Sequence, residues 1–146
     1  MSLKLFEPSF IGKLKLKNRI VMAPMFAMGM ADKTPQMGLS RRGIDYYVAR
    51  AKGGIGLIIT GITCPSEKME KSWGYPLIGN QGAVMWLSEL AEAVHDYGVK
   101  IFVQYSAGFG CQAPPDPNLP NGGLVAPSKI RSFYSPEITC GELTTG

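Results

Sequence analysis

The fold is decided by the stretch NRIVMAPM, Asn18 to Met25, in which an apolar run ends abruptly in a proline. Ile20 to Met22 have the bulk of a strand that is covered on both faces. Pro24 has no backbone N–H to donate, so strand pairing is expected to stop at that residue. A buried strand that ends so sharply is typical of a binding site, and we expect a ligand to lie just after Ala23.

Length and composition indicate one globular domain. The chain has 146 residues, 45% of them hydrophobic and 18% charged, which suffices for one core. The net charge of +4 is modest, and no basic stripe is interleaved with aromatic residues, so we expect no nucleic-acid partner. No apolar run has the length of a signal peptide or a membrane span, so a cytoplasmic protein without a membrane partner is expected.

Neither the cysteines nor the histidine indicate a metal site or a catalytic base. The three cysteines, Cys64, Cys111 and Cys140, are widely spaced and odd in number, which argues against a disulfide framework or a CxxC metal site and favours a reducing compartment. Cys111 is expected to be a free thiol on a loop, because no partner base lies near it in the sequence. His95, near the end of a helix, is expected to be solvated or to cap that helix.

A small hairpin is predicted before the first buried strand. Residues 10–11 and 14–17 flank Gly12-Lys13, a link with glycine first that suits a type II′ turn. Residues 26–39, after the strand, have no clear period and are expected to form a loop.

Two helices are predicted next, each of which ends at a glycine. Ser40 is expected to cap the first helix, which Gly53 ends, and Asn80 to cap the second, which Gly98 ends. Tyr47 is expected to pack rather than to take part in chemistry, as is its neighbour Tyr46. The apolar stripes at helical spacing are Ile44, Tyr47, Val48 and Ala51 in the first helix and Val84, Leu87, Ala91 and Val94 in the second.

Further buried strands are predicted at residues 55–60, with Gly61 at the end, and at 99–104. The three strands begin about 35 and then about 44 residues apart, which suits right-handed crossovers in a parallel sheet. A closed barrel and an open doubly wound sheet both repeat such units. No GxGxxG motif follows the first strand, and Gly108-Phe109-Gly110 enters a proline-rich loop, so the barrel is favoured. Since a barrel takes about 250 residues, we expect the chain to be the front part of a larger protein.

Short motifs occur in a fixed order along the whole chain: LFEP at 5–8, LKNRIVMAPM at 16–25, RGIDYY at 42–47, AKGG at 51–54, LIITG at 57–61, VQ at 103–104, AGFG at 107–110, APS at 126–128 and ELTT at 142–145. Together they resemble the old yellow enzyme family of FMN-dependent oxidoreductases, particularly its enoate, dienoyl-CoA and bile-acid-type NADH:flavin oxidoreductase branch. The resemblance implies an α/β fold. Residues 1–146 would be the N-terminal portion of an FMN-binding TIM (β/α)8 barrel, with a hairpin and about three βα units.

The resemblance also implies a flavin at the carboxyl ends of the strands. The amide of Gln104 would match the alternating donor and acceptor edge of the flavin pyrimidine. The alternatives are that Pro24 merely ends a strand and that Gln104 satisfies local backbone groups. The implied FMN-binding residues are Pro24, Met25, Phe26, Gly61, Ile62 and Gln104.

Some positions depart from the family pattern, and the catalytic residues are expected elsewhere. Phe26 stands where many relatives carry cysteine, threonine or histidine, and Cys111 and Gly141 stand where near relatives often have arginine. The His/Asn substrate pair, the proton-donating tyrosine and the phosphate loops would lie beyond Gly146, and residues 142–145 are expected to begin a third helix. An iron–sulfur cluster and FAD would require a longer C-terminal region.

The function implied by the resemblance is reduction of an activated alkene, such as an enoate, a dienoyl-CoA or an enone, by NADH or NADPH through FMN. The expected partners are a small-molecule substrate and further copies of the chain, with contacts through residues 20–22 and 101–103. The segment alone is expected to be inactive. The alternative is a truncated or degenerate non-catalytic copy that self-associates and binds no flavin.

Overall fold

The computed structural model describes residues 3–26, 29–32, 38–65, 75–79, 81–106 and 108–144. The chain divides into two compact units, Met1–Ser106 and Ala107–Gly146. Each is described by itself below.

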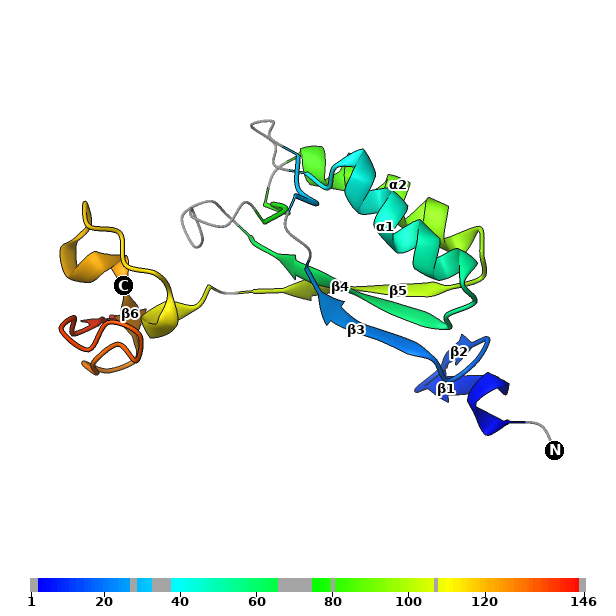
Figure 1. Ribbon diagram of the computed structural model, residues 1–146, viewed down its shortest axis with the longest axis horizontal. Helices are drawn as coiled ribbons and strands as arrows, with labels where there is room; N and C mark the ends of the chain where they lie inside the picture. Colours follow the sequence, from blue (N-terminus) through cyan, green and yellow to red (C-terminus); the bar gives the residue numbers. More distant parts are fainter. Residues whose placement is uncertain are drawn as a thin grey trace. The chain divides into compact units, whose positions relative to one another are not determined.

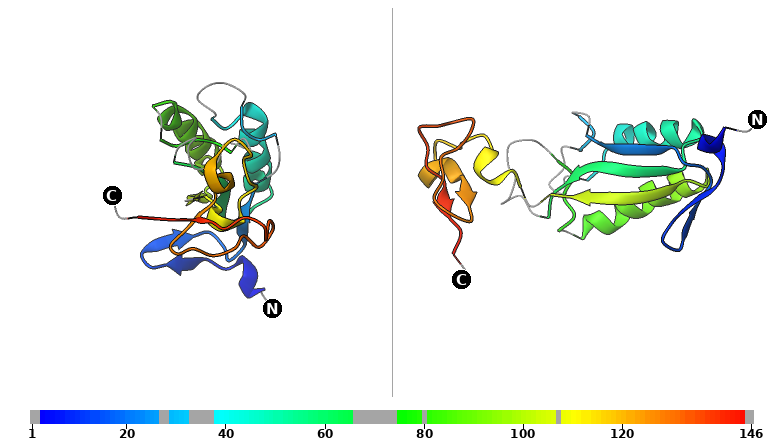
Figure 2. Two further views of the ribbon diagram at one scale, coloured as in Figure 1. Left: turned by 90° about the vertical axis from the view of Figure 1, so that its left-hand side faces the viewer. Right: turned by 90° about the horizontal axis from the view of Figure 1, so that it is seen from below.

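The first unit is built on a parallel sheet with the strand order β3-β4-β5. Its strands are β3 (Val21–Met25), β4 (Leu57–Thr63) and β5 (Lys100–Tyr105). Helix α1 (Arg41–Lys52) connects the first pair and α2 (Gly82–His95) the second, and both helices lie on the same face of the sheet (Figures 1 and 2). The predicted β-α-β-α-β order and the parallel pairing are thus confirmed.

The predicted hairpin is also present before the sheet. It follows a short 3-10 helix, η1 (Lys4–Phe6), and pairs β1 (Ser9–Ile11) with β2 (Leu14–Leu16) in antiparallel register. Gly12 in its turn has a φ of 57°, a backbone angle that glycine adopts without strain.

The core lies between the helices and the sheet. Ser40 caps α1 as predicted, because its Oγ accepts a hydrogen bond from the Gly43 N–H over 3.2 Å. The predicted stripe of α1 is confirmed, since Ile44, Tyr47 and Ala51 are buried. These residues pack with Ile58 of β4 in one apolar cluster.

The predicted stripe of α2 is confirmed at Val94, which is buried, but the other three predicted positions are displaced by one residue from the buried ones. Val84 is 69% exposed, and the face that packs on the core consists of Ala83, Trp86, Leu90 and Val94. Residues 82–94 are mostly small or apolar, so two neighbouring stripes fit helical spacing, and the bulk of Trp86 decides between them. The predicted cap Asn80 lies outside the described residues.

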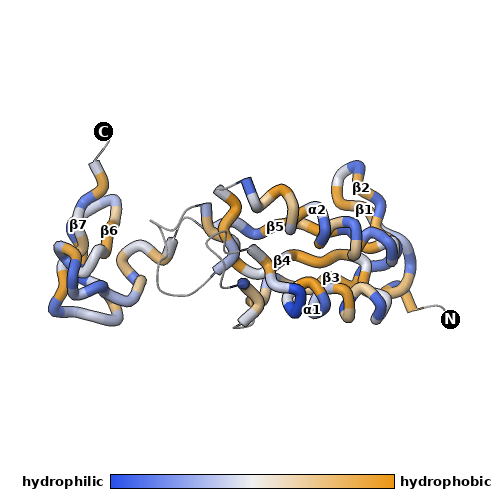
Figure 3. Tube along the Cα trace, turned by 90° about the horizontal axis from the view of Figure 1, so that it is seen from above, coloured by the Kyte–Doolittle hydropathy of each residue, from blue (hydrophilic) through white to orange (hydrophobic). Residues whose placement is uncertain are grey.

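The prediction that pairing stops at Pro24 is wrong, because β3 continues to Met25, which pairs with Thr60. The strand is also not covered on both faces, since the side chains of Val21 and Met25 are 45% and 62% exposed. The apolar side chains of β3 lie on both faces of the sheet, the one that packs on the core and the one turned away from the helices. Figure 3 shows hydrophobic residues along all three strands.

The second unit is held by short elements and a disulfide. It contains the 3-10 helices η2 (Gly110–Gln112) and η3 (Pro120–Gly123) and a parallel pair, β6 (Val125–Ala126) with β7 (Gly141–Glu142). Glu142 is therefore in a strand, and the prediction of a helix that begins at this residue is wrong. Residues 143 and 144 are not helical either.

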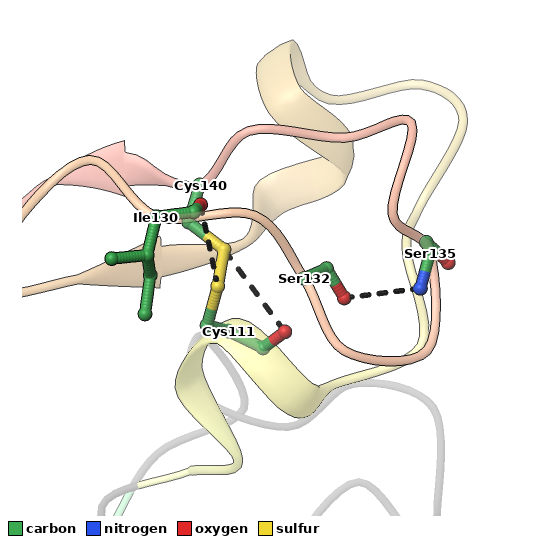
Figure 4. The surroundings of a disulfide bond; sticks show 5 residues. All are labelled: Cys111, Ile130, Ser132, Ser135 and Cys140. Carbon is green, nitrogen blue, oxygen red and sulfur yellow. Dashed lines mark hydrogen bonds between the residues drawn. A yellow bond between two sulfur atoms is a disulfide. The ribbon is translucent and has the colours of Figure 1, made fainter.

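The prediction of a free thiol at Cys111 is wrong as well. Cys111 and Cys140 form a disulfide across a sequence separation of 29 residues (Figure 4). The Cys140 N–H donates to the Ile130 carbonyl over 2.8 Å and fixes its strand beside the preceding loop. The spacing of the cysteines in the sequence does not reveal this disulfide, because the loop between Cys111 and Cys140 brings the two residues together.

None of the described helices is long and apolar enough to cross a membrane.

Candidate functional site

The predicted site residues lie at the carboxyl ends of three neighbouring parallel strands. In the ladder Met25 pairs with Thr60, and Ile62 pairs with Gln104. In open and closed parallel sheets this is the edge at which ligands bind. Strand β4 extends to Thr63, so Gly61 lies inside this strand and not at its end as the sequence predicts.

Gly61 brings the ends of β3 and β4 into close contact. A Cβ atom at this position would lie 2.7 Å from the Met25 carbonyl oxygen and 2.7 Å from the Phe26 Cα. Only glycine permits this approach. The structure thus brings Met25, Phe26 and Gly61 together.

Two adjacent β-bulges shape this end of the sheet. Between Met22 and Met25, β3 has one residue more than the facing part of β4. Between Ile59 and Ile62, β4 in turn has one residue more than β5. Bulges re-aim the residues that follow them and are frequent beside binding sites.

Three side chains supply hydrogen bonds where the bulges interrupt the ladder. The buried Tyr47 Oη accepts from the Gly61 N–H over 2.8 Å. Thr60 Oγ1 accepts from the Gln104 N–H over 3.1 Å, and Thr63 Oγ1 donates to the Gln104 carbonyl over 2.7 Å. The backbone of Gln104 is therefore held on both sides by β4.

The side chain of Gln104 lies on the sheet face away from the helices. Ile101 packs against the core, and alternation along β5 puts Phe102 and Gln104 on the opposite face. Phe102 is 40% exposed there. Among the described residues, no hydrogen-bond partner is found for the Gln104 side-chain amide, so its donor and acceptor remain available to a ligand.

A small cavity lined by described residues lies on the helix side of the strand ends. Its volume is about 10 Å³, and its lining includes Phe26, Tyr47 and Trp86. The indole Nε1 of Trp86 is buried without a partner within the described part of the chain. This volume suits one water molecule at most.

Phe26 packs beside the site with its ring against Tyr75. The two ring centroids are 5.0 Å apart, with an interplanar angle of 72°, which is a favourable edge-to-face arrangement. Pro24 lies one residue before Met25 in the bulged part of β3. His95 is exposed at the end of α2, as predicted.

Sequence reasoning missed the polar roles of Tyr47, Thr60 and Thr63. Tyr47 is 1% exposed and packs as predicted, yet a buried tyrosine hydroxyl needs a partner, and this is the signal that could have revealed its bond. Burial raises the pKa of Tyr47, while the hydrogen bond from Gly61 lowers it by a smaller amount. The hydroxyl is therefore protonated at neutral pH.

Comparison with known sequences identifies relatives along the whole chain. The profile of the NADH:flavin oxidoreductase / NADH oxidase family matches residues 4–144. A cinnamate reductase from Clostridium sporogenes is 45% identical over 97% of the chain and 21% of its own length. An NADH oxidase from Thermoanaerobacter brockii is 45% identical over 68% of the chain and 15% of its own length. The chain thus spans about a fifth of the length of the curated relatives it matches.

Solved structures show the same fold. The old yellow enzyme homologue from Zymomonas mobilis has a TM-score of 0.73 and 28% identity, with 97% of this chain and 40% of that one covered. Morphinone reductase in complex with tetrahydroNAD has a TM-score of 0.76 and 28% identity, with 99% and 42% covered. These neighbours are TIM barrels, and the α/β fold of this chain corresponds to part of such a barrel. On sequence and fold together, the chain belongs to the NADH:flavin oxidoreductase / NADH oxidase family.

Proposed function

We propose that this chain forms part of the FMN site of an oxidoreductase that reduces activated alkenes with NADH or NADPH. The observation that carries the proposal is the available amide of Gln104 beside the strand ends that Gly61 holds together. The residues proposed to contact FMN are Pro24, Met25, Phe26, Gly61, Ile62 and Gln104.

The chemistry of this surface fits a flavin ring. Met25 is 62% exposed and Phe102 40% exposed, which offers an apolar platform for the planar ring system. Gln104 would give one donor and one acceptor to the pyrimidine edge, where N3–H and the carbonyl groups alternate. Pro24 adds stiffness to the strand end without an unpaired N–H.

The residues of this chain would bind and orient the cofactor. When bound, FMN supplies the hydride-transfer chemistry between the nicotinamide and the alkene. The apolar face around Met25 and Phe102 would exclude water from one side of the ring.

For the substrate we propose an enoate, an α,β-unsaturated carboxylate. Support comes from the 45% identity with cinnamate reductase, the name of which describes a substrate of that class. A dienoyl-CoA and an enone are the other candidates. The name of the NADH oxidase relative supports NADH as the reductant, whereas NADPH dehydrogenases at 33% and 34% identity keep NADPH as the alternative.

The competing candidate is a non-catalytic protein that self-associates and binds no flavin. It draws support from the exposed apolar side chains of Val21 and Met25 on one strand, since such a surface favours association. A homo-oligomer is proposed in either case.

The test is flavin content and activity of the full-length protein. We expect stoichiometric FMN after purification, released by heat and identified by mass spectrometry. NADH oxidation under anaerobic conditions should then depend on cinnamate or a related enoate. Purification without flavin, together with no binding of added FMN, would support the non-catalytic candidate.

A further inference from the structure

We propose that Tyr47, Thr60 and Thr63 are positioning residues for the flavin, which act by holding the backbone of Gly61 and Gln104 at the bulged strand ends. This inference rests on the proposed function. None of the three side chains is among the residues proposed to contact FMN, so their effect must pass through the backbone that they bind.

The first step is the position of the bulges. The extra residue of β4 lies between Ile59 and Ile62, so the strand loses regular pairing immediately before the proposed contact residues. An interrupted ladder leaves backbone groups that need other partners. Such partners add to the ladder pairing of Ile62 with Gln104 in fixing the position of Gln104 relative to β4.

The second step is the identity of the substitute partners. Thr60 and Thr63 bind the N–H and the carbonyl of the same residue, Gln104, over 3.1 Å and 2.7 Å. Both threonines are 3% exposed. The two bonds fix the backbone of Gln104 from both sides, and thereby the place from which its side-chain amide extends.

The third step is the link to the helix layer. Tyr47 comes from α1 and reaches Gly61 over 2.8 Å. Gly61 in turn lies against the backbone of Met25 and Phe26. The buried Tyr47 hydroxyl therefore holds the backbone where β3 and β4 come into contact. It does so from the sheet face opposite to the proposed ligand.

The experiment compares Thr63→Val with Thr63→Ser, and Thr60→Val with Thr60→Ser, in the full-length protein. Valine keeps the shape and removes the hydroxyl, whereas serine restores it. We expect each valine variant to raise the FMN Kd about tenfold, which corresponds to about 1.4 kcal/mol, and to shift the flavin midpoint potential. Each serine variant should return both quantities toward the wild-type values.

Ser40→Ala is the matched control. It removes two hydrogen bonds of the Ser40 Oγ, which accepts from the Gly43 N–H over 3.2 Å and donates to the Met30 carbonyl over 2.7 Å. Both lie at the N-terminus of α1 and outside the sheet strands. It should lower the melting temperature of the apoprotein but leave the FMN Kd and the potential unchanged. If FMN binding were weakened only through a general loss of stability, the FMN Kd would rise in Ser40→Ala as well as in the valine variants.

Tyr47→Phe provides a second route if a valine variant fails to fold. The ring and its packing remain, while the Gly61 N–H loses its acceptor. We expect faster hydrogen exchange at the Gly61 amide, weaker FMN binding and a shifted potential.

The outcomes separate the two proposals. If wild-type protein binds FMN while the valine variants and Tyr47→Phe keep its Kd and its potential, the positioning role is overturned and the proposed function stands. The role is also overturned if Ser40→Ala weakens FMN binding as much as the valine variants do. If the wild-type protein binds no FMN, the proposed function itself fails.

Discussion

The side chain of Asn18 joins the start of β3 to the end of α1, since its Nδ2 donates to the carbonyl oxygen of Gly54 over 2.7 Å. Its Oδ1 accepts from the Ile20 N–H over 3.1 Å. Asn18 is 8% exposed, and a Cβ on Gly56 would lie 2.6 Å from its Oδ1. Asn18 thus has a structural role apart from any ligand.

Replacement of Asn18 by alanine should destabilise the protein. The change leaves the Gly54 carbonyl and the Ile20 N–H without their partner, and we expect a loss of about 1–3 kcal/mol in the free energy of unfolding. Urea denaturation measures it. Asn118→Ala is the control, because it makes the same change at an exposed loop position, where the side chain donates to Asp116. It should lower the free energy of unfolding far less. Equal losses in the two variants would contradict the structural role of Asn18.

Gly61→Ala should disturb the site and the fold together. The added methyl group would meet the Met25 carbonyl and the Phe26 backbone at 2.7 Å, a distance that forces one strand end to move. We expect a loss of about 1–3 kcal/mol in stability, as is usual for overpacking, and weaker FMN retention. Gly53→Ala is the control, because Gly53 has a φ of −68° and its nearest neighbour would lie at 3.3 Å. Wild-type flavin retention in Gly61→Ala would argue against the close approach.

Gln104→Leu should weaken FMN binding without unfolding the protein. The backbone bonds to Thr60 and Thr63 remain, and only the side-chain amide is lost. We expect a loss of about 1–3 kcal/mol in binding free energy, or a shift in the flavin midpoint potential. Val103→Ile tests an ordinary apolar change at the neighbouring position. Unchanged affinity and potential in Gln104→Leu would remove this residue from the site.

The stability of the protein should depend on Tyr47 at alkaline pH. Burial raises the pKa of this phenol above its ordinary value of 10.0, so the folded state favours the neutral form. The stabilising contribution is therefore complete below about pH 10 and is lost as the pH rises through the folded-state pKa. Urea denaturation from pH 8 to 11 should show a steeper decline for wild type than for Tyr47→Phe. Parallel curves would exclude Tyr47 as the source.

The disulfide should stabilise the second unit. The chain has three cysteines, of which Cys111 and Cys140 are bonded. In denatured, unreduced protein a thiol reagent should therefore label Cys64 but neither Cys111 nor Cys140, as determined by peptide mapping. With a separation of 29 residues, chain entropy alone gives about 3–4 kcal/mol of stabilisation. Cys111→Ser and Cys140→Ser should each increase protease cleavage within residues 108–144. Labelling of Cys111 and Cys140 in the unreduced protein would disprove the bond.

Local signals in the sequence were sufficient for the hairpin, for α1 and for the order of the three strands of the main sheet, but not for the ends of β3 and β4. Apolar runs, the Ser40 cap and the glycine stops each depend on a few neighbouring residues, and the ordered motifs are the basis for the site residues that we propose. The bulges were not predictable, because the register of β4 depends on both flanking strands. The disulfide depends on a loop closure across the whole second unit, and the core face of α2 depends on how Trp86 fits beneath it.

The paired bulges also determine how this segment can be recombined with relatives. From Met25 onward, the pairing of β3 with β4 is shifted by one residue relative to the pairing up to Met22. The pairing of β4 with β5 is shifted in the same way between Ile59 and Ile62. A shift of one residue exchanges the two faces of a strand. A chimera with a junction between these levels, made with a parent that lacks one of the bulges, would turn the side chains of the proposed site toward the helices. Crossover points should therefore lie before β3 or in α2, so that both bulges, Tyr47 and Gly61 are inherited from one parent.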